Sequence, residues 1–114
     1  MSDCLFCKIV AGEIPAKVVA ESESSLAFYD IASQAPVHVL VIPKKHFTSV
    51  NHVTSSDPHV FDDLMSLAQE VVRDEGIKES GYSLVINVGE DGQQSVAHLH
   101  LHVLGGRKLT WPPG

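Results

Sequence analysis

Three histidines recur at every second position near the carboxyl end of the chain. The segment His98–Leu104 reads H-L-H-L-H-V-L, an alternation typical of a β-strand, on which successive side chains point to opposite faces. His98, His100 and His102 would then line one face, with neighbouring Cα atoms about 6.6 Å apart. Because imidazole is both a nucleophile and a base near neutral pH, the row has three interpretations: an ordinary polar face, a metal site or a catalytic site.

The two cysteines, Cys4 and Cys7, form a C-x-x-C pair, and the sequence contains no others for a disulfide framework. A redox motif of this type normally follows a strand, but the three residues before Cys4 leave no room for one. Two further interpretations are a pair of buried, unreactive thiols and half of a zinc site. Zinc takes four ligands, and C-x-x-C supplies two of them from one turn.

Short elements surround these reactive residues. Residues 3–11 predict a short helix that Gly12 ends. Strand-like patterns cover Val18–Glu23, Ser25–Asp30, Val37–Pro43, Tyr82–Val88 and Val96–Leu104. The first two of these strands are close enough to form a hairpin, and Gly89–Gln94 is predicted to be a turn.

A long amphipathic helix is predicted in the middle of the chain. Asp57 is the expected N-cap, Pro58 suits the first turn, and Gly76 or Gly81 would end the helix. Apolar side chains follow the helical period at Val60, Phe61, Leu64, Met65, Ala68, Val71 and Val72. We expect this wide apolar stripe to face the core.

The order of the elements favours an α+β fold. Short connections favour an antiparallel meander of about five strands, and the long crossover from 44 to 81 carries the helix, which must cover one face of the sheet. The other face of the sheet is then left to carry a site.

Composition limits the class of protein. The 114 residues suit a single domain, and 44% hydrophobic residues supply a core. A net charge of −6 argues against a protein dedicated to duplex nucleic acid. The longest aliphatic run, Val39–Ile42, is too short for a membrane span, and the acidic start at Asp3 argues against a signal peptide, so a cytoplasmic location is expected.

The chain resembles the histidine triad (HIT) superfamily, and within it the nucleotide-binding branch, over nearly its whole length. H-L-H-L-H-V-L fits the triad signature itself. Further matching segments lie at 9–16, 26–31, 34–46 (which includes P-K-K-H), 92–107 and 111–114, where the sequence is W-P-P-G. The resemblance implies a single HIT domain over 1–114, with a tail at 105–114 that reaches toward a partner subunit.

The activity implied by this resemblance is hydrolysis of purine nucleoside phosphoramidates or related nucleotidyl conjugates. His100 would attack the α-phosphorus and carry a covalent nucleotidyl intermediate that water then hydrolyses, with no cofactor needed for catalysis. His102 and His38 would stabilise charge and move protons beside the phosphate. His98, the first triad histidine, completes the catalytic set.

The resemblance also assigns a nucleotide-binding set. Asp30 would accept hydrogen bonds from the ribose hydroxyls, and the alternative on the sequence alone is a turn aspartate that closes a strand. An apolar purine slot would be formed by Phe6, Ile9, Ile14 and Ile31, and the phosphate would be held by Asn87, Gln94 and Ser95. Gln93 stands where the branch often has glycine, so the backbone of this loop could differ.

Some HIT proteins with a C-x-x-C pair complete a structural zinc site with two histidines. The corresponding residues here are His46 and His98, which would join Cys4 and Cys7 in a closed site with no open position for water. His52 and His59 have no such assignment and are expected on the surface.

The implied partner molecules are a purine nucleotide or phosphoramidate and a second copy of the chain, with no duplex nucleic acid and no membrane. In this branch two protomers join their sheets, and each tail approaches the partner's site.

Two other functions stay open: a nucleotide-binding or scaffolding module without catalysis, and a metallohydrolase that gathers all three triad histidines on one zinc. Against the second, histidines along a single strand form a nearly linear row.

Overall fold

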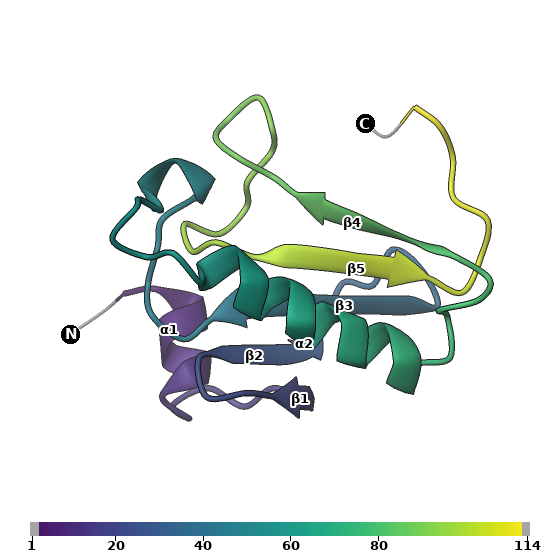
Figure 1. Ribbon diagram of the computed structural model, residues 1–114, viewed down its shortest axis with the longest axis horizontal. Helices are drawn as coiled ribbons and strands as arrows, with labels where there is room; N and C mark the ends of the chain where they lie inside the picture. The colour runs from purple at the N-terminus through teal and green to yellow at the C-terminus, as the bar shows by residue number, and fades with distance from the viewer. Residues whose placement is uncertain (1–2, 113–114) are drawn as a thin grey trace.

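The computed structural model describes residues 3–112, which contain two α-helices, a short 3-10 turn and five strands (Figure 1). In chain order the elements are α1 (Leu5–Val10), β1 (Val18–Glu21), β2 (Ser25–Tyr29), β3 (Val37–Pro43), the 3-10 turn (Val50–His52), α2 (Val60–Asp74), β4 (Tyr82–Ile86) and β5 (Leu101–Gly105). This architecture confirms the predicted α+β class, with a five-stranded antiparallel sheet, one long helix and one short helix.

The strands lie in the order β1-β2-β3-β5-β4, and each neighbouring pair is antiparallel. The order departs from the chain order at one point, because β5 inserts between β3 and β4. Within the β3–β5 pair, His38 lies opposite Leu104 and Leu40 lies opposite His102. Opposed residues share a face, so His38 and His102 project from the same side of the sheet.

The two faces of the sheet have different covers, as Figure 1 shows for α2. The long helix packs on one face, where its buried side chains Leu64, Leu67, Ala68, Val71 and Val72 meet Ala27, Val39, Val41, Leu101 and Val103. On the opposite face Phe6 of α1 packs in a smaller cluster with Leu26, Phe28, Leu40 and Ile42. The face without the long helix is therefore only partly covered, as the sequence predicted for the site face.

The start of the long helix differs from the sequence prediction. Asp57 is not the N-cap: α2 begins at Val60, and His59 in the capping position makes no side-chain cap hydrogen bond. The Asp57 carboxylate instead accepts a hydrogen bond from Lys45 Nζ at 2.9 Å, so a charged partner holds the oxygen that a cap would use. The predicted end at Gly76 agrees with the structure, where this glycine has a φ of +73° directly after the helix.

The buried stripe of the helix is rotated relative to the predicted one. Met65 is 36% exposed, whereas Leu67, which the predicted stripe omitted, is buried against the sheet. The fully buried positions of the helix are 64, 67, 68, 71 and 72, which still follow the helical period, and Val60 and Phe61 pack partly buried against the same cluster.

The last strand is shorter than predicted. The pattern predicted a strand over Val96–Leu104, but the ladder with β3 starts only at Leu101, opposite Val41. Before that point the chain leaves the sheet, and the Leu99 N–H donates to the carbonyl of Phe47 at 2.7 Å. His98 and His100 consequently lie in an irregular segment, where their side chains need not follow the two-residue alternation of a strand.

None of the helices within residues 3–112 combines the length and the hydrophobicity that crossing a bilayer requires.

Candidate active site

A hollow of about 860 Å³ opens on the sheet face opposite α2, between α1, the 14–17 segment and the ends of β2, β3 and β5. One side of this hollow is apolar and includes Phe6, Ile9 and Ile14. The other side carries the chemistry-bearing residues Asp30, His38, His100 and His102. A molecule with one flat apolar end and one charged end matches this division.

His100 is buried, with 3% of its surface exposed, and one backbone group sets its tautomer. Its Nδ1 lies 2.8 Å from the carbonyl oxygen of His98, and a carbonyl can only accept, so Nδ1 carries the proton. The lone pair of the neutral ring is therefore on Nε2. The edge-to-face contact with Phe6, at 5.2 Å between ring centroids, holds the ring in this orientation.

His38 has the opposite tautomer. The Gln34 N–H donates to His38 Nδ1 at 3.0 Å, so the proton of the neutral ring is on Nε2. That nitrogen lies 2.9 Å from His102 Nδ1 and 3.4 Å from Asp30 Oδ2. When His38 donates to His102 Nδ1, the proton of His102 is on Nε2. Hydrogen bonds to backbone groups thus leave the lone pair of His100 on Nε2. Acting through His38, they also place the N–H of His102 on Nε2.

Burial keeps His38 and His102 neutral in the free protein. Burial, together with the neighbouring His100 and His38, lowers the pKa of His102 to about 4, although the Asp30 carboxylate opposes the shift. Burial also lowers the pKa of His38 from its usual value, again against the effect of Asp30. A bound anion would reverse this balance, because negative charge favours the protonated ring.

The predicted nucleotide-binding residues divide into two groups. Asp30, Ile31, Phe6, Ile9, Ile14 and Ser95 all line the hollow. The Asp30 Oδ1 accepts the Ala32 N–H at 2.8 Å, so the carboxylate is oriented by the loop that follows it. Asn87 and Gln94 are not among the lining residues.

The Gln94 side chain holds the 89–96 loop together. Its Nε2 donates to the carbonyls of Thr48 and Val96, at 2.6 and 3.0 Å, and its Oε1 accepts the Gly89 N–H at 3.1 Å. These bonds occupy both donors and the carbonyl oxygen, so the amide braces its own loop and ties it to the backbone at Thr48. The neighbouring Gln93 has a φ of +57°, the left-handed region that favours glycine, in agreement with the glycine common at this position in the branch it resembles.

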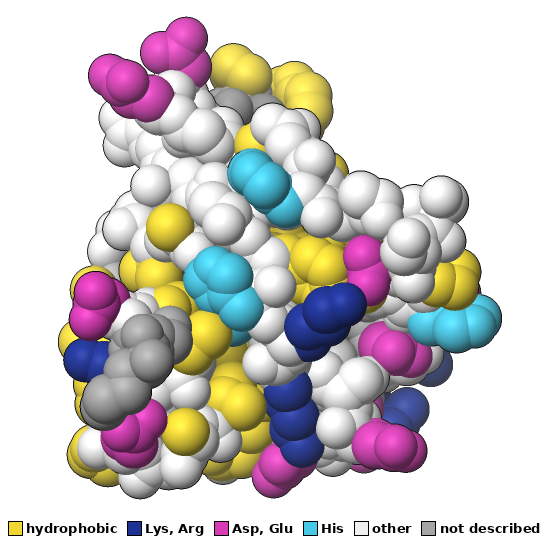
Figure 2. All heavy atoms as spheres, turned by 90° about the vertical axis from the view of Figure 1, so that its left-hand side faces the viewer, with side chains coloured by type: hydrophobic (Ala, Val, Ile, Leu, Met, Phe, Trp, Pro, Cys, Tyr) yellow, Lys and Arg dark blue, Asp and Glu magenta, His cyan; other side chains and the backbone are white. Residues whose placement is uncertain are grey.

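Four side chains gather at the end of the molecule where α1 lies. Cys4 Sγ and Cys7 Sγ lie 3.3 and 3.5 Å from His98 Nδ1, and His46 Nδ1 lies 3.3 Å from Cys7 Sγ and 3.1 Å from His98 Nδ1. All four ligand atoms lie within 4.8 Å of one another. Figure 2 faces this end, where histidine side chains reach the surface among hydrophobic ones.

The chemistry of this cluster fits a tetrahedral zinc ion. Zinc–sulfur bonds of about 2.3 Å and zinc–nitrogen bonds of about 2.0 Å separate tetrahedral ligand atoms by roughly 3.3–3.8 Å, close to the separations found here. The Nε2 of His98 donates to the Pro43 carbonyl at 2.8 Å, which leaves the lone pair on the Nδ1 that faces the cysteines. The two sulfurs and two imidazoles form a complete Cys₂His₂ set.

A second group of ligand-type atoms, from Asp30, His38 and His102, also lies within 4.8 Å. Its tautomers do not suit a metal, because the Gln34 N–H leaves His38 Nε2 protonated on the side that faces the group. His98, moreover, points to the cysteines and not to His100 and His102. The three triad histidines therefore do not converge on one point, which argues against the metallohydrolase interpretation.

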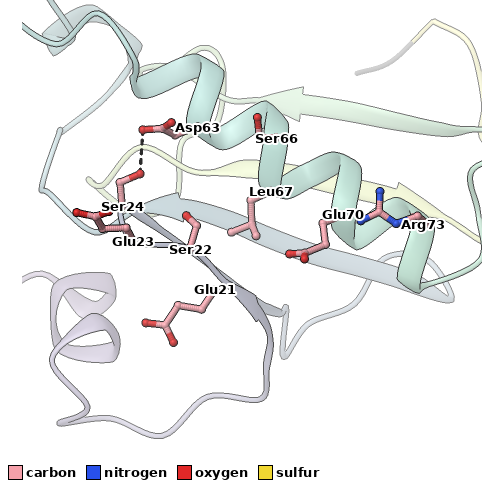
Figure 3. Close-up of a pocket in the computed structure, with 9 residues that line it drawn as sticks. All are labelled: Glu21, Ser22, Glu23, Ser24, Asp63, Ser66, Leu67, Glu70 and Arg73. Atoms are coloured by element: carbon pink, nitrogen blue, oxygen red, sulfur yellow. Dashed lines mark hydrogen bonds between the residues drawn. The ribbon is translucent and has the colours of Figure 1, made fainter.

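Another hollow of about 730 Å³ lies between α2 and the turn that joins β1 to β2 (Figure 3). Its side chains include the carboxylates of Glu21, Glu23, Asp63 and Glu70, and Ser24 donates to Asp63 at 2.8 Å. Histidine and cysteine are absent from its lining, so it lacks the imidazoles that line the first hollow.

A comparison with models of protein families shows which family the chain belongs to. The family model for the HIT domain matches residues 11–109. The chain belongs to the HIT domain family. Its relatives include an uncharacterized HIT-like protein of Synechococcus elongatus, 46% identical over 98% of this chain and 97% of the relative.

Solved structures agree with the fold of this HIT domain. A HIT family hydrolase from Legionella pneumophila is 52% identical, with a TM-score of 0.95 over 98% of this chain and all of that one. A histidine triad protein from Clostridium difficile is 38% identical, with a TM-score of 0.93 over 96% of each chain.

Sequence reasoning could not find every group that builds the site of this HIT domain. It missed the backbone carbonyls of His98 and Pro43 and the backbone N–H of Gln34, which set the three tautomers. These groups leave no trace in residue type, because every residue carries a carbonyl and all but proline carry an N–H. In the sequence, the segment P-V-H at 36–38 indicates a turn before the histidine of β3, but it does not indicate which backbone group bonds to the ring.

The low pKa of His102 predicts a specific pH dependence of stability. The folded-state pKa of about 4 lies below the unfolded value of about 6.5, so the unfolded chain takes up this proton first and stability falls as the pH drops between these values. For His102→Gln, the loss of unfolding free energy between about pH 7 and pH 4.5 should be smaller than in wild type by on the order of 2 kcal/mol.

Urea titrations at each pH measure this difference, with His59→Gln as the control, since His59 is exposed. The control should keep the wild-type pH dependence. Identical pH dependence in wild type and His102→Gln would contradict the prediction.

Proposed function

We propose that this HIT domain hydrolyses purine nucleoside phosphoramidates, or closely related nucleotidyl conjugates, through a covalent nucleotidyl-histidine intermediate. The observation that carries the proposal is the tautomer of His100, whose Nε2 lone pair belongs to a ring lining the hollow. A buried imidazole with an oriented lone pair is suited to nucleophilic attack. The names of the Legionella and Clostridium thermocellum relatives, both HIT family hydrolases, support the general class of reaction.

The first half of the reaction transfers the nucleotidyl group to the protein. His100 Nε2 attacks the α-phosphorus, and the bond between phosphorus and the amine nitrogen breaks. The amine leaves readily only when it is protonated, and the negative phosphate raises the pKa of His102 from its low value in the free protein. The protonated His102 gives its Nε2 proton to the amine and becomes neutral.

The second half releases the nucleotide. Neutral His102 accepts a proton from water as the water oxygen attacks phosphorus, and the bond from phosphorus to His100 Nε2 breaks. The products are a nucleoside monophosphate and the original His100, and His102 is again protonated. In these protonated and Nδ1–H forms His102 cannot accept from His38, whose Nε2–H would then donate to Asp30 Oδ2, 3.4 Å away. The nitrogen of His102 that exchanges the proton is Nε2, because Nδ1 faces His38 at 2.9 Å.

The nucleoside would occupy the rest of the hollow. Phe6, Ile9 and Ile14 provide apolar contacts for a purine, and Ile31 lies on the open rim. Asp30 offers an acceptor to the vicinal ribose hydroxyls. Ser95 lines the hollow and would donate to the phosphate, and we retain Asn87 as a second phosphate ligand. Gln94 would act indirectly, by holding the loop that presents Ser95.

Replacing the nucleophile tests the mechanism. His100→Ala should lower turnover of adenosine 5′-monophosphoramidate by at least about 10³-fold, because the covalent route is lost, while the fold remains. Rapid acid quench of the wild type should trap nucleotide mass on the peptide that contains His98–His102. His52→Ala, at an exposed histidine, is the matched control and should keep wild-type turnover.

Near-wild-type turnover by His100→Ala would overturn the mechanism. Wild-type protein that binds purine nucleotides but hydrolyses no phosphoramidate or related conjugate would instead support the binding-module function.

We also propose that Cys4, Cys7, His46 and His98 hold a structural zinc ion. The separations of their ligand atoms and the His98–Pro43 hydrogen bond support a closed site, in which zinc would join α1 to the loop after β3. A thiolate pair persists in a reducing compartment, which agrees with the proposed cytoplasmic location.

The protein purified with zinc in the medium should contain about one zinc per chain, measured by metal analysis. His46→Gln should lose most of this metal and unfold at a lower temperature, because one of four ligands is gone. His52→Gln replaces a histidine outside the cluster and should retain both zinc and stability. Wild-type protein without zinc, or with melting unaffected by its removal, would exclude the structural site.

A homodimer is proposed through the edge of the sheet. β4 lies at the end of the strand order, and its Tyr82 and Leu84 are exposed. Exposed edge strands are surfaces on which two sheets join. We further propose that the tail at 105–114 approaches the partner's hollow, with Trp111 exposed near its described end.

Charge on β4 should separate such a dimer. Leu84→Lys should convert a particle of twice the 12.3 kDa chain mass into a monomer in sedimentation equilibrium, because lysine opposes edge pairing. Met65→Lys is the matched control, since Met65 on α2 is 36% exposed and Leu84 is 39% exposed. The control should remain a dimer. A monomeric wild type, or a dimer in both variants, would contradict this arrangement.

A further inference from the structure

The segment that follows β5 packs closely on the loop between β2 and β3. Gly106 has a φ of +88°, and a Cβ at this position would lie 2.8 Å from Pro36 Cβ. Only glycine combines this backbone conformation with so close an approach. The chain therefore leaves β5 pressed against residues 34–37.

Arg107 extends this contact with hydrogen bonds. Its Nη2 donates to the Gln34 carbonyl at 2.9 Å, and its Nη1 donates to the carbonyl of Lys108 at 3.2 Å. The guanidinium thus joins the beginning of the tail to residue 34, which is 73 positions earlier in the chain. Arginine suits such a contact because its planar head presents several donors in a fixed geometry.

Gln34 is the residue whose N–H sets the tautomer of His38, at 3.0 Å from Nδ1. Its side chain also donates to the Ala32 carbonyl at 2.8 Å, and the Ala32 N–H donates to Asp30 Oδ1. Residue 34 is therefore held by Arg107 through its carbonyl, bonds His38 directly through its N–H, and reaches Asp30 only through Ala32.

We propose that Arg107 is a positioning residue for the histidine pair of the active site: by holding the Gln34 carbonyl, it keeps the Gln34 N–H aimed at His38 Nδ1, and so fixes the proton of His38 on Nε2 and the proton of His102 on its own Nε2. This inference rests on the proposed function for its effect on turnover. Its effect on the tautomer is independent of any substrate.

The physical reason lies in the two neutral tautomers of imidazole. They differ little in free energy in water, so a single hydrogen-bond donor aimed at Nδ1 decides between them. If residue 34 can move away, His38 loses that donor and populates the tautomer with the proton on Nδ1. That tautomer cannot donate to His102 Nδ1, and the N–H of His102 is no longer directed to Nε2.

The test compares Arg107→Ala with Arg107→Lys and with Arg73→Ala. Lysine can still donate to the Gln34 carbonyl, so it should restore part of the effect, and Arg73→Ala removes an exposed arginine of α2 that does not line the hollow. Arg107 is exposed and its loss leaves the core intact. Thermal melting of each variant verifies the fold.

Two readouts are measured. In ¹⁵N-histidine NMR, wild-type His38 should show an unprotonated Nδ1 and a protonated Nε2, whereas Arg107→Ala should show averaging between tautomers. In kinetics with adenosine 5′-monophosphoramidate, Arg107→Ala should lower kcat by about 3- to 10-fold, the range expected for one lost hydrogen bond, with little change in KM. Arg107→Lys should lie between the two, and Arg73→Ala should match the wild type in both.

The outcomes separate this inference from the proposed function. Unchanged NMR signals of His38 in Arg107→Ala would overturn the positioning role, whatever the kinetics show. A shifted tautomer with unchanged kcat in an active enzyme would also overturn it, since the histidine pair would then not limit the reaction. A wild type without phosphoramidate turnover would defeat the proposed function, while a shifted tautomer in Arg107→Ala would still support the structural coupling.

Discussion

The pairing of β5 with β3 is the constraint on which the rest of the site depends. In this register His102 lies opposite Leu40 and His38 lies opposite Leu104, so both imidazoles project to the face that α2 leaves open. A slip of one residue would turn His102 toward the helix and bring Leu101 and Val103 to the site face. The apolar contacts that Leu101 and Val103 make beneath α2 oppose such a slip, so packing on one face of the sheet determines the chemistry on the other.

The register places the imidazoles, and hydrogen bonds to backbone groups then set the tautomer of each ring. Three imidazoles of one chain have three different partners: His98 faces the Pro43 carbonyl, His100 the His98 carbonyl and His38 the Gln34 N–H. A carbonyl and an amide select opposite tautomers, so the peptide group beside each imidazole decides which ring nitrogen keeps a lone pair and which one donates.

The sequence predicts the parts of this arrangement that residue type determines. The strand Val37–Pro43 and the paired Cys4 and Cys7 were both recognisable, the first from β-branched composition and the second from spacing. Where tertiary contacts decide, prediction was wrong. Met65 fits the helical period but is 36% exposed, and the Asp57 carboxylate forms an ion pair with Lys45 instead of capping the helix. The irregular segment before Leu101 arises because Leu99 bonds to Phe47, a contact that alternation cannot reveal.

His98 takes part in two structures through different atoms, its ring in the cysteine cluster and its carbonyl in the hydrogen bond to His100. A main-chain carbonyl is supplied by every amino acid, whereas a ring nitrogen is supplied by histidine alone. Descendants of this chain could therefore lose the cysteines, and even the first histidine of the triad, while the nucleophile keeps its orientation. The proposed metal site and the proposed nucleotide chemistry share His98, yet natural selection can act on each of them separately.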